Sequence, residues 1–209
     1  ELEDAKQVEK DQYDQTRVAM GIHPQQFRWM LSPGETFTAP ETVMSYSDQG
    51  LTGLSHIYHD IFRDNLCRSK FVHQPRPVLI NSWEAVYFDF NHAKLMEIAK
   101  AAKELGVDLF VLDDGWFGNR NNDSVSLGDW TENKTKLPRG LAGLAEDLKK
   151  EGLKFGLWLE PEMISENSRL YEEHPDWCLH VPGRPVTRGR YQLVLDLSRK
   201  DVCDYIVKF

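Results

Sequence analysis

The sequence predicts an α/β fold with a parallel sheet in the second part of the chain. Three short apolar runs, at residues 77–83, 107–112 and 154–159, lack the polar alternation of a half-exposed strand. Two amphipathic segments with helical spacing, at residues 91–106 and 141–152, lie between them. Strands that are buried on both faces read as continuous apolar runs, and the helices between them cover the sheet. A closed barrel and a doubly wound sheet both fit this pattern.

The first 46 residues have a different character. Val8, Val18, Met20 and Trp29 lie in short runs that glycine and proline interrupt, which predicts two or three antiparallel strands. Because a two-stranded hairpin is only marginally stable by itself, we expect residues 1–46 to be the end of a larger β domain.

A linker helix is predicted at residues 47–75. Residues 47–49 (Ser-Asp-Gln) offer N-caps, and apolar residues follow at helical spacing over residues 51–66. We therefore divide the chain into a β part at residues 1–46, this linker, and a βα part at residues 76–209.

The end of the chain is predicted to continue the βα pattern. A strand-like run at residues 192–197 leads to Ser198, the expected N-cap of a helix that continues to Phe209. A complete (β/α)₈ barrel takes about 250 residues, whereas 134 residues run from Arg76 to Phe209. A barrel would therefore need roughly half of its length beyond Phe209.

Composition excludes several classes of protein. The net charge of -8 argues against a nucleic-acid partner. No apolar run reaches the roughly 20 residues of a membrane-spanning helix, and residues 1–20 are charged throughout, unlike a signal peptide. Cys67, Cys178 and Cys203 are widely spaced and form no CxxC motif, as is usual for reduced thiols. We expect a cytoplasmic protein without a membrane partner.

Carboxylates and tryptophans follow each of the three apolar strands. Trp83 ends the first, Asp113 and Asp114 follow the second, and Trp158 and Glu160 lie at the end of the third. The carboxyl ends of parallel strands form the edge at which ligands bind. Carboxylates accept hydrogen bonds from neighbouring hydroxyls, and an indole packs on the apolar face of a sugar ring. The pattern predicts a carbohydrate site.

Other interpretations of these residues remain open. An aspartate after a strand often caps a turn, Trp158 can belong to the core, and Glu160 and Glu162 can pair with arginines. The histidines form no HxH or HExxH motif, which argues against a histidine-bound metal, and Asp113, Asp114 and Glu160 are an alternative Mg²⁺ or Ca²⁺ set. Asp114 and Glu160 also fit the two carboxylates of a glycosidase, which lie about 5 to 10 Å apart.

Seven motifs occur in a characteristic order. They are residues 76–85 (RPVLINSWEA), 110–118 (FVLDDGWFG), 127–130 (LGDW), 137–138 (LP), 155–163 (FGLWLEPEM), 174–177 (HPDW) and 193–199 (LVLDLSR). Together they resemble the bacterial family 36 α-galactosidases of the melibiase type, from about residue 21 to residue 209.

The resemblance implies a fold and a mechanism. The fold is an N-terminal β-supersandwich, whose last strands are residues 1–46, then a linker helix and the first part of a catalytic (β/α)₈ TIM barrel. The mechanism is retaining: an aspartate attacks the anomeric carbon, and a second carboxylic acid protonates the leaving oxygen. The family's nucleophile lies in a Lys-x-Asp segment on the fourth barrel strand. Neither catalytic residue is then expected within residues 1–209, and no cofactor is implied.

The recognition half of the site is implied to be present. Asp113 and Asp114 match the pair that accepts hydrogen bonds from the 4- and 6-hydroxyls of galactose. Trp158 matches a tryptophan of the sugar subsite, Arg190 an arginine that contacts the substrate, and Trp83 an aromatic residue near the mouth of the site.

The expected function is removal of terminal α-linked galactose from oligosaccharides of the melibiose and raffinose type, by an enzyme that is a homo-oligomer, usually a tetramer, when full length. A galactosyl transferase or an α-N-acetylgalactosaminidase of the same clan is the nearest alternative. A non-catalytic galactose-binding module is the alternative from another class, and a phosphate-binding barrel enzyme is a third.

Overall fold

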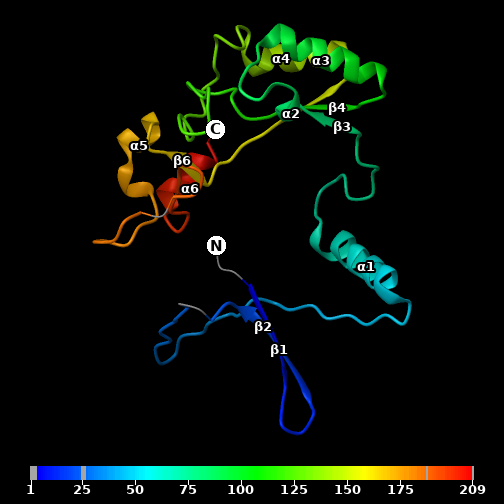
Figure 1. Cartoon of the computed structure of the whole chain (residues 1–209), viewed down its shortest axis with the longest axis vertical. Coiled ribbons are helices and arrows are strands. Elements are labelled where there is room, and N and C mark those ends of the chain that lie inside the picture. Colours follow the sequence, from blue (N-terminus) through cyan, green and yellow to red (C-terminus); the bar gives the residue numbers. More distant parts are fainter. Residues whose placement is uncertain (1–3, 25–26, 187, 209) are drawn as a thin grey trace. The chain divides into compact units, whose positions relative to one another are not determined.

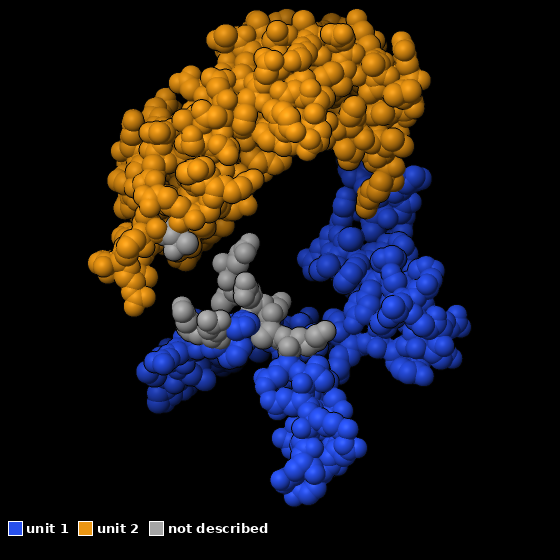
Figure 2. Space-filling view, in the orientation of Figure 1, with its two compact units in different colours: residues 1–75 blue, residues 76–209 orange. Residues whose placement is uncertain are grey.

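The computed structural model describes residues 4–24, 27–186 and 188–208 and divides into two compact units, Glu1–Pro75 and Arg76–Phe209 (Figures 1 and 2). Each unit is described by itself. Within the described residues, no helix has both the length and the apolar character that crossing a membrane requires.

The first unit contains one β-hairpin. Strands β1 (Asp4–Lys10) and β2 (Thr16–Ile22) pair antiparallel, with Val8 opposite Val18. The carboxylate of Asp11 accepts the N–H groups of Tyr13 and Gln15, at 2.9 and 3.0 Å, which closes the turn. Two of the predicted two or three antiparallel strands are therefore confirmed.

The possible third strand of this unit does not form in the described residues 27–46. Trp29 and Met30 are 61% and 87% exposed. An extended segment becomes a strand only when its N–H and C=O groups pair with a neighbouring strand. The described part of the unit offers these residues no such neighbour.

The predicted linker helix is α1 (Gly50–Ile61), which is followed by a short π-helical turn, η1 (Phe62–Leu66). The Ser47 hydroxyl accepts the N–H of Gln49 at 3.1 Å, before the helix begins, and α1 has no side-chain N-cap. No residue of α1 is buried. Its apolar side chains are at most half-buried, and Tyr58 contacts the ring of Phe62 and donates its hydroxyl to the carbonyl of Val43 at 2.9 Å.

The second unit is built on a parallel sheet, as predicted. Strands β3 (Leu79–Asn81), β4 (Leu109–Leu112) and β5 (Lys154–Leu157) lie in the order β3-β4-β5, with Ile80, Phe110 and Phe155 in register. The strands are shorter than the apolar runs that predicted them. Strands β3 and β5 end two residues before their runs do, where the chain leaves the ladder at the carboxyl edge, whereas β4 begins two residues after its run does.

Helices α3 (His92–Glu104) and α4 (Gly140–Lys150) connect the strands and pack side by side (Figure 1). The Asn91 side chain accepts the N–H of Lys94 at 3.0 Å and caps α3. Gly106 follows the helix at φ +85°, a conformation that favours glycine. A short helix that was not predicted, α2 (Trp83–Val86), comes directly after β3.

One hydrophobic core joins this sheet to both helices. It contains the fully buried side chains of β4, α3 and α4, namely Phe110, Leu112, Leu95, Ala99, Leu144 and Leu148. The apolar face of each helix thus covers the sheet, and the burial fixes the strand ends relative to one another.

A second, smaller core lies in residues 163–206. It is formed by β6 (Met163–Ser165), α5 (Arg169–Glu173), η2 (Pro175–Trp177), β7 (Gln192–Val194) and α6 (Lys200–Ile206). Its buried side chains are Ile164, Leu170, Trp177, Cys178, Leu193, Leu195 and Val202.

Three predictions for this last part are corrected. The strand predicted at residues 192–197 is β7, which pairs antiparallel with β6 and not with the parallel sheet. The predicted N-cap, Ser198, instead binds the carboxylate of Asp196 through its hydroxyl and its N–H, so α6 begins at Lys200. The helix ends at Ile206, where the N–H of Lys208 bonds to the carbonyl of Tyr205 and tightens the last turn. Phe209 lies outside the described residues.

Candidate functional site

The carboxyl edge of the parallel sheet holds Asp113 in a defined position. Its Oδ2 accepts a hydrogen bond from the Asn81 side chain at the end of β3. Its backbone N–H donates to the hydroxyl of Ser82 at 3.1 Å, and its Oδ1 accepts the N–H of Asp114 at 2.8 Å. Residues of two neighbouring strands therefore fix this carboxylate.

Asp114 is buried and paired with a buried arginine. The two residues are 6% and 1% exposed. Arg120 donates from Nε to both carboxylate oxygens, at 3.0 and 3.1 Å, and from Nη2 to Oδ2 at 2.8 Å. A buried charge needs a partner that also satisfies its hydrogen bonds, and the guanidinium supplies both.

The turn between these two residues depends on a glycine. Gly115 has φ +99°, which L side chains rarely adopt. A Cβ at this position would also lie 3.0 Å from the ring of Phe88 and 3.3 Å from the carbonyl oxygen of Arg120. The chain can therefore turn sharply after Asp114 and bring Arg120 back to it.

Lys136 holds the backbone of the same loops. Its ammonium group donates to the carbonyls of Phe88, Gly115 and Arg120 at 3.0, 2.9 and 3.1 Å, and lies 4.6 Å from the centre of the Phe90 ring. Burial lowers the pKa of Lys136, whereas the negative charge of Asp114 opposes this shift. The lysine thus joins the loop after β3 to the loop after β4.

Arg120 and Lys136 were not among the residues predicted for the site. The sequence contains one indication of a residue such as Arg120, because two consecutive carboxylates at a buried edge require a cation as partner. Several arginines of the sequence meet that requirement, and their spacing does not distinguish them.

Glu160 and Arg190 form a second pair. Arg190 Nη2 donates to Glu160 Oε1 at 2.9 Å, whereas Glu160 Oε2 is buried without a hydrogen-bond partner. Burial raises the pKa of Glu160, and this effect outweighs the lowering by the charge of Arg190. Arg190 and Tyr191 both have left-handed backbone angles, φ +49° and +63°, which are uncommon for residues other than glycine.

The two tryptophans lie at the ends of their strands. Trp83 begins α2 and meets the rings of Tyr87 and Phe88 edge-on, each at 5.1 Å. Trp158 extends the ladder after β5 by donating its N–H to the carbonyl of Leu112 at 2.9 Å. Its half-buried side chain packs against the core, so its indole contributes to packing as well as to the edge.

The structure thus gathers Asp113, Asp114 and Trp158 at the ends of the neighbouring strands β4 and β5, and Trp83 at the end of β3. Arg190 joins this edge through Glu160. Fixed carboxylates with remaining acceptor positions can receive the hydroxyls of a polar ligand. Within the described residues, no group of three or more His, Cys, Asp or Glu side chains is arranged to hold a metal ion.

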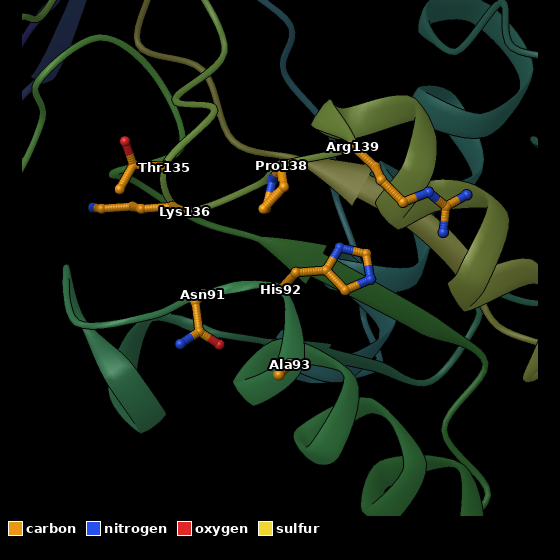
Figure 3. A pocket seen from close by; sticks show the side chains of 7 residues that line it. All are labelled: Asn91, His92, Ala93, Thr135, Lys136, Pro138 and Arg139. Atoms are coloured by element: carbon orange, nitrogen blue, oxygen red, sulfur yellow. The ribbon is translucent and has the colours of Figure 1, made fainter.

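A pocket of about 380 Å³ lies elsewhere, between the start of α3 and the loop that precedes α4 (Figure 3). Its lining residues are Asn91, His92, Ala93, Thr135, Lys136, Pro138 and Arg139. None of the five predicted site residues lines it. The candidate site is therefore an edge of the sheet and not this pocket.

Comparison with known proteins identifies close relatives. Residues 36–209 match the family model described as Melibiase. α-Galactosidase AgaA of Geobacillus stearothermophilus is 60% identical over 202 residues, which are 97% of this chain and 28% of that protein. The chain therefore spans less than a third of the length of this relative.

Solved structures of the same enzyme agree with this result. A variant of it in complex with raffinose has a TM-score of 0.93 and 58% identity, covering 98% of this chain and 29% of that one. A second variant, in complex with stachyose, has a TM-score of 0.91 and 59% identity, covering 96% of this chain and 28% of that one. These neighbours are family 36 α-galactosidases, which are TIM-barrel enzymes. The chain belongs to the melibiase family, the family 36 α-galactosidases.

Proposed function

We propose that this chain is the galactose-recognising part of a retaining α-galactosidase, which removes terminal α-linked galactose from oligosaccharides of the melibiose and raffinose type. The observation that carries the proposal is the pair of adjacent carboxylates, Asp113 and Asp114, each held by fixed partners at the carboxyl edge of a parallel sheet. The relatives in complex with raffinose and stachyose support the choice of substrate.

Such a pair gives a physical basis for choosing galactose over glucose. The two sugars differ in the direction of the 4-hydroxyl. A buried carboxylate that receives an axial 4-hydroxyl is left unpaired by an equatorial one, and an unpaired buried acceptor costs about 1 to 3 kcal/mol. Asp114, 6% exposed, is the more deeply buried of the two carboxylates. Trp158, Arg190 and Trp83 complete the proposed sugar subsite.

The proposal includes the arrangement of the domains. Residues 76–209 form the first part of a (β/α)₈ barrel, residues 1–46 are the last strands of a β-sandwich, and residues 47–75 are the linker. The parallel order β3-β4-β5 and the unit boundary at Pro75 support this arrangement.

The proposed nucleophile and acid/base lie outside residues 1–209. Asp114 is held by Arg120, and Glu160 by Arg190, so both candidates for catalysis within the chain have structural partners. We place the complete enzyme in the cytoplasm as a homo-oligomer, in keeping with the family resemblance.

The test uses two proteins: the complete protein whose gene contains this sequence, and residues 1–209 alone. The complete protein should hydrolyse raffinose, stachyose and an aryl α-galactoside. An aryl α-glucoside, which differs at C4, is the matched control substrate and should react far more slowly. Residues 1–209 should release no product.

Two results would contradict the proposal. Failure of the complete protein to cleave any α-galactoside would remove the function. Persistent turnover by purified residues 1–209 would restore Asp114 and Glu160 as a catalytic pair.

A further inference from the structure

Arg120 is enclosed in a way that leaves its guanidinium group little freedom. The residue is 1% exposed. Its Nη1 donates to the carbonyl of Val125 at 3.0 Å, while Nε and Nη2 hold Asp114. The rings of Phe88 and Phe117 lie 5.8 and 6.0 Å from its central carbon. Its own carbonyl is bonded to Lys136. Both the guanidinium group and the backbone carbonyl of Arg120 are therefore held by hydrogen bonds.

This arrangement constrains the carboxylate of Asp114 as well. Three N–H···O contacts define the plane of the carboxylate, because a guanidinium meets a carboxylate as a planar fork. Two oxygens have about four acceptor positions between them. The fork occupies one side of the group, and the remaining lone pairs are left in a fixed direction.

We infer that Arg120 is a positioning residue for sugar recognition: it fixes the direction in which Asp114 accepts a hydroxyl of galactose. The inference rests on the proposed function. Arg120 does not touch the sugar, and its effect reaches the substrate through the Asp114 carboxylate alone. Lysine cannot replace it, since a single ammonium group is a point charge and does not define the carboxylate plane.

The experiment compares substrates that lack one hydroxyl. Arg120→Lys and Arg120→Gln are made in the complete protein, and kcat/KM is measured for an aryl α-galactoside and for its 4-deoxy and 6-deoxy analogues. The ratio of two kcat/KM values from one preparation does not depend on the fraction of folded enzyme. A loss of stability therefore leaves the ratio unchanged, whereas loss of positioning changes it.

The ratio compared is kcat/KM for the parent galactoside divided by kcat/KM for a deoxy analogue. For the analogue without the hydroxyl that Asp114 receives, we expect this ratio to be at least tenfold lower in both Arg120 variants than in wild type. The ratio for the other analogue should change less than threefold. A control variant is Arg199→Lys, because Arg199 binds Asp201 through the same two atoms, Nε and Nη2, in a partly exposed pair. It should leave both ratios unchanged.

If both ratios in both Arg120 variants stay within threefold of the wild-type values, the inference is overturned. It is also overturned if neither variant yields folded enzyme, because Arg120 is then a structural residue. The variant Asp114→Asn distinguishes failure of this inference from failure of the proposed function. If wild type hydrolyses galactosides, and Asp114→Asn lowers the ratio at least tenfold while the Arg120 variants do not, only the role inferred for Arg120 is wrong. If wild type is inactive, or Asp114→Asn has no effect, the proposed function itself fails.

Discussion

Glu160 carries two carboxylate oxygens in unlike surroundings. One oxygen receives Arg190 and the other is buried without a hydrogen-bond partner. Burial therefore dominates, and the pKa of Glu160 is raised above its ordinary value of 4.5. The positive charges of Arg190, whose side chain is 71% exposed, and of Arg120 do not offset the loss of water, and the negative charges of Glu162 and Asp114 add to the rise.

The raised pKa predicts how stability depends on pH. The folded protein holds the Glu160 proton more tightly than the unfolded chain does, so the free energy of unfolding falls as the pH rises from 4.5 through the raised pKa. Glu160→Gln removes the ionisable group and with it this decrease in the free energy of unfolding. Relative to wild type, the variant should gain in Tm as the pH is raised from 4 to 8.

Tm measured across that pH range in the complete protein checks this prediction. Glu104→Gln is the matched control, because Glu104 is an exposed carboxylate on α3, and its difference from wild type should stay flat. A wild-type protein that becomes more stable than Glu160→Gln as the pH rises would mean that the Arg190 pair outweighs burial.

Among individual residues, the two carboxylates at the end of β4 were easier to predict than the cations that hold them and their loops. Asp113 and Asp114 stand out because two acids follow an apolar strand. Arg120 and Lys136 are buried cations in polar loops, and their burial results from the turn at Gly115 and from carbonyls that only the folded loops bring together. Local sequence carries no signal for such long-range contacts.

The same distinction holds for elements. Helix α3 was predicted to within two residues at either end, because its cap and terminal glycine act locally. Strand β7 was predicted as a strand, but its antiparallel pairing with β6 depends on a contact about 30 residues away in sequence. Periodicity predicts an element, whereas its partner is decided by packing.

Lys136 provides a test at the level of elements, since it joins the loops after β3 and β4. Lys136→Met leaves three carbonyls without their shared donor. A buried group without its partner costs about 1 to 3 kcal/mol, so we expect Tm to fall by at least about 4 °C.

Thermal unfolding of the complete protein measures this effect. Lys94→Met is the control, because the Lys94 side chain is 42% exposed and, among the residues that the structure describes, its ammonium group binds only Asp89. Its Tm should fall by less than about 2 °C. Equal losses in the two variants would show that Lys136 does not hold the loops together.

For the molecule as a whole, the family relationship covers nearly the full chain, whereas the chain covers less than a third of its relative. The sheet β3-β4-β5 presents one carboxyl edge, and Asp113, Asp114, Trp158 and Trp83 lie there. The proposal assigns galactose binding to this edge and places the catalytic carboxylates outside residues 1–209.

The most direct measurement is kcat/KM of the complete protein for an aryl α-galactoside after Asp114→Asn, with Asp113→Asn measured in parallel. Each substitution keeps the size of the side chain and removes its charge. We predict a loss of at least 100-fold, which corresponds to about 2.7 kcal/mol of transition-state binding. Asp123→Asn, the same change at an exposed loop position, should alter kcat/KM by less than threefold. A change below threefold in both site variants would contradict the account and remove the two aspartates from the site.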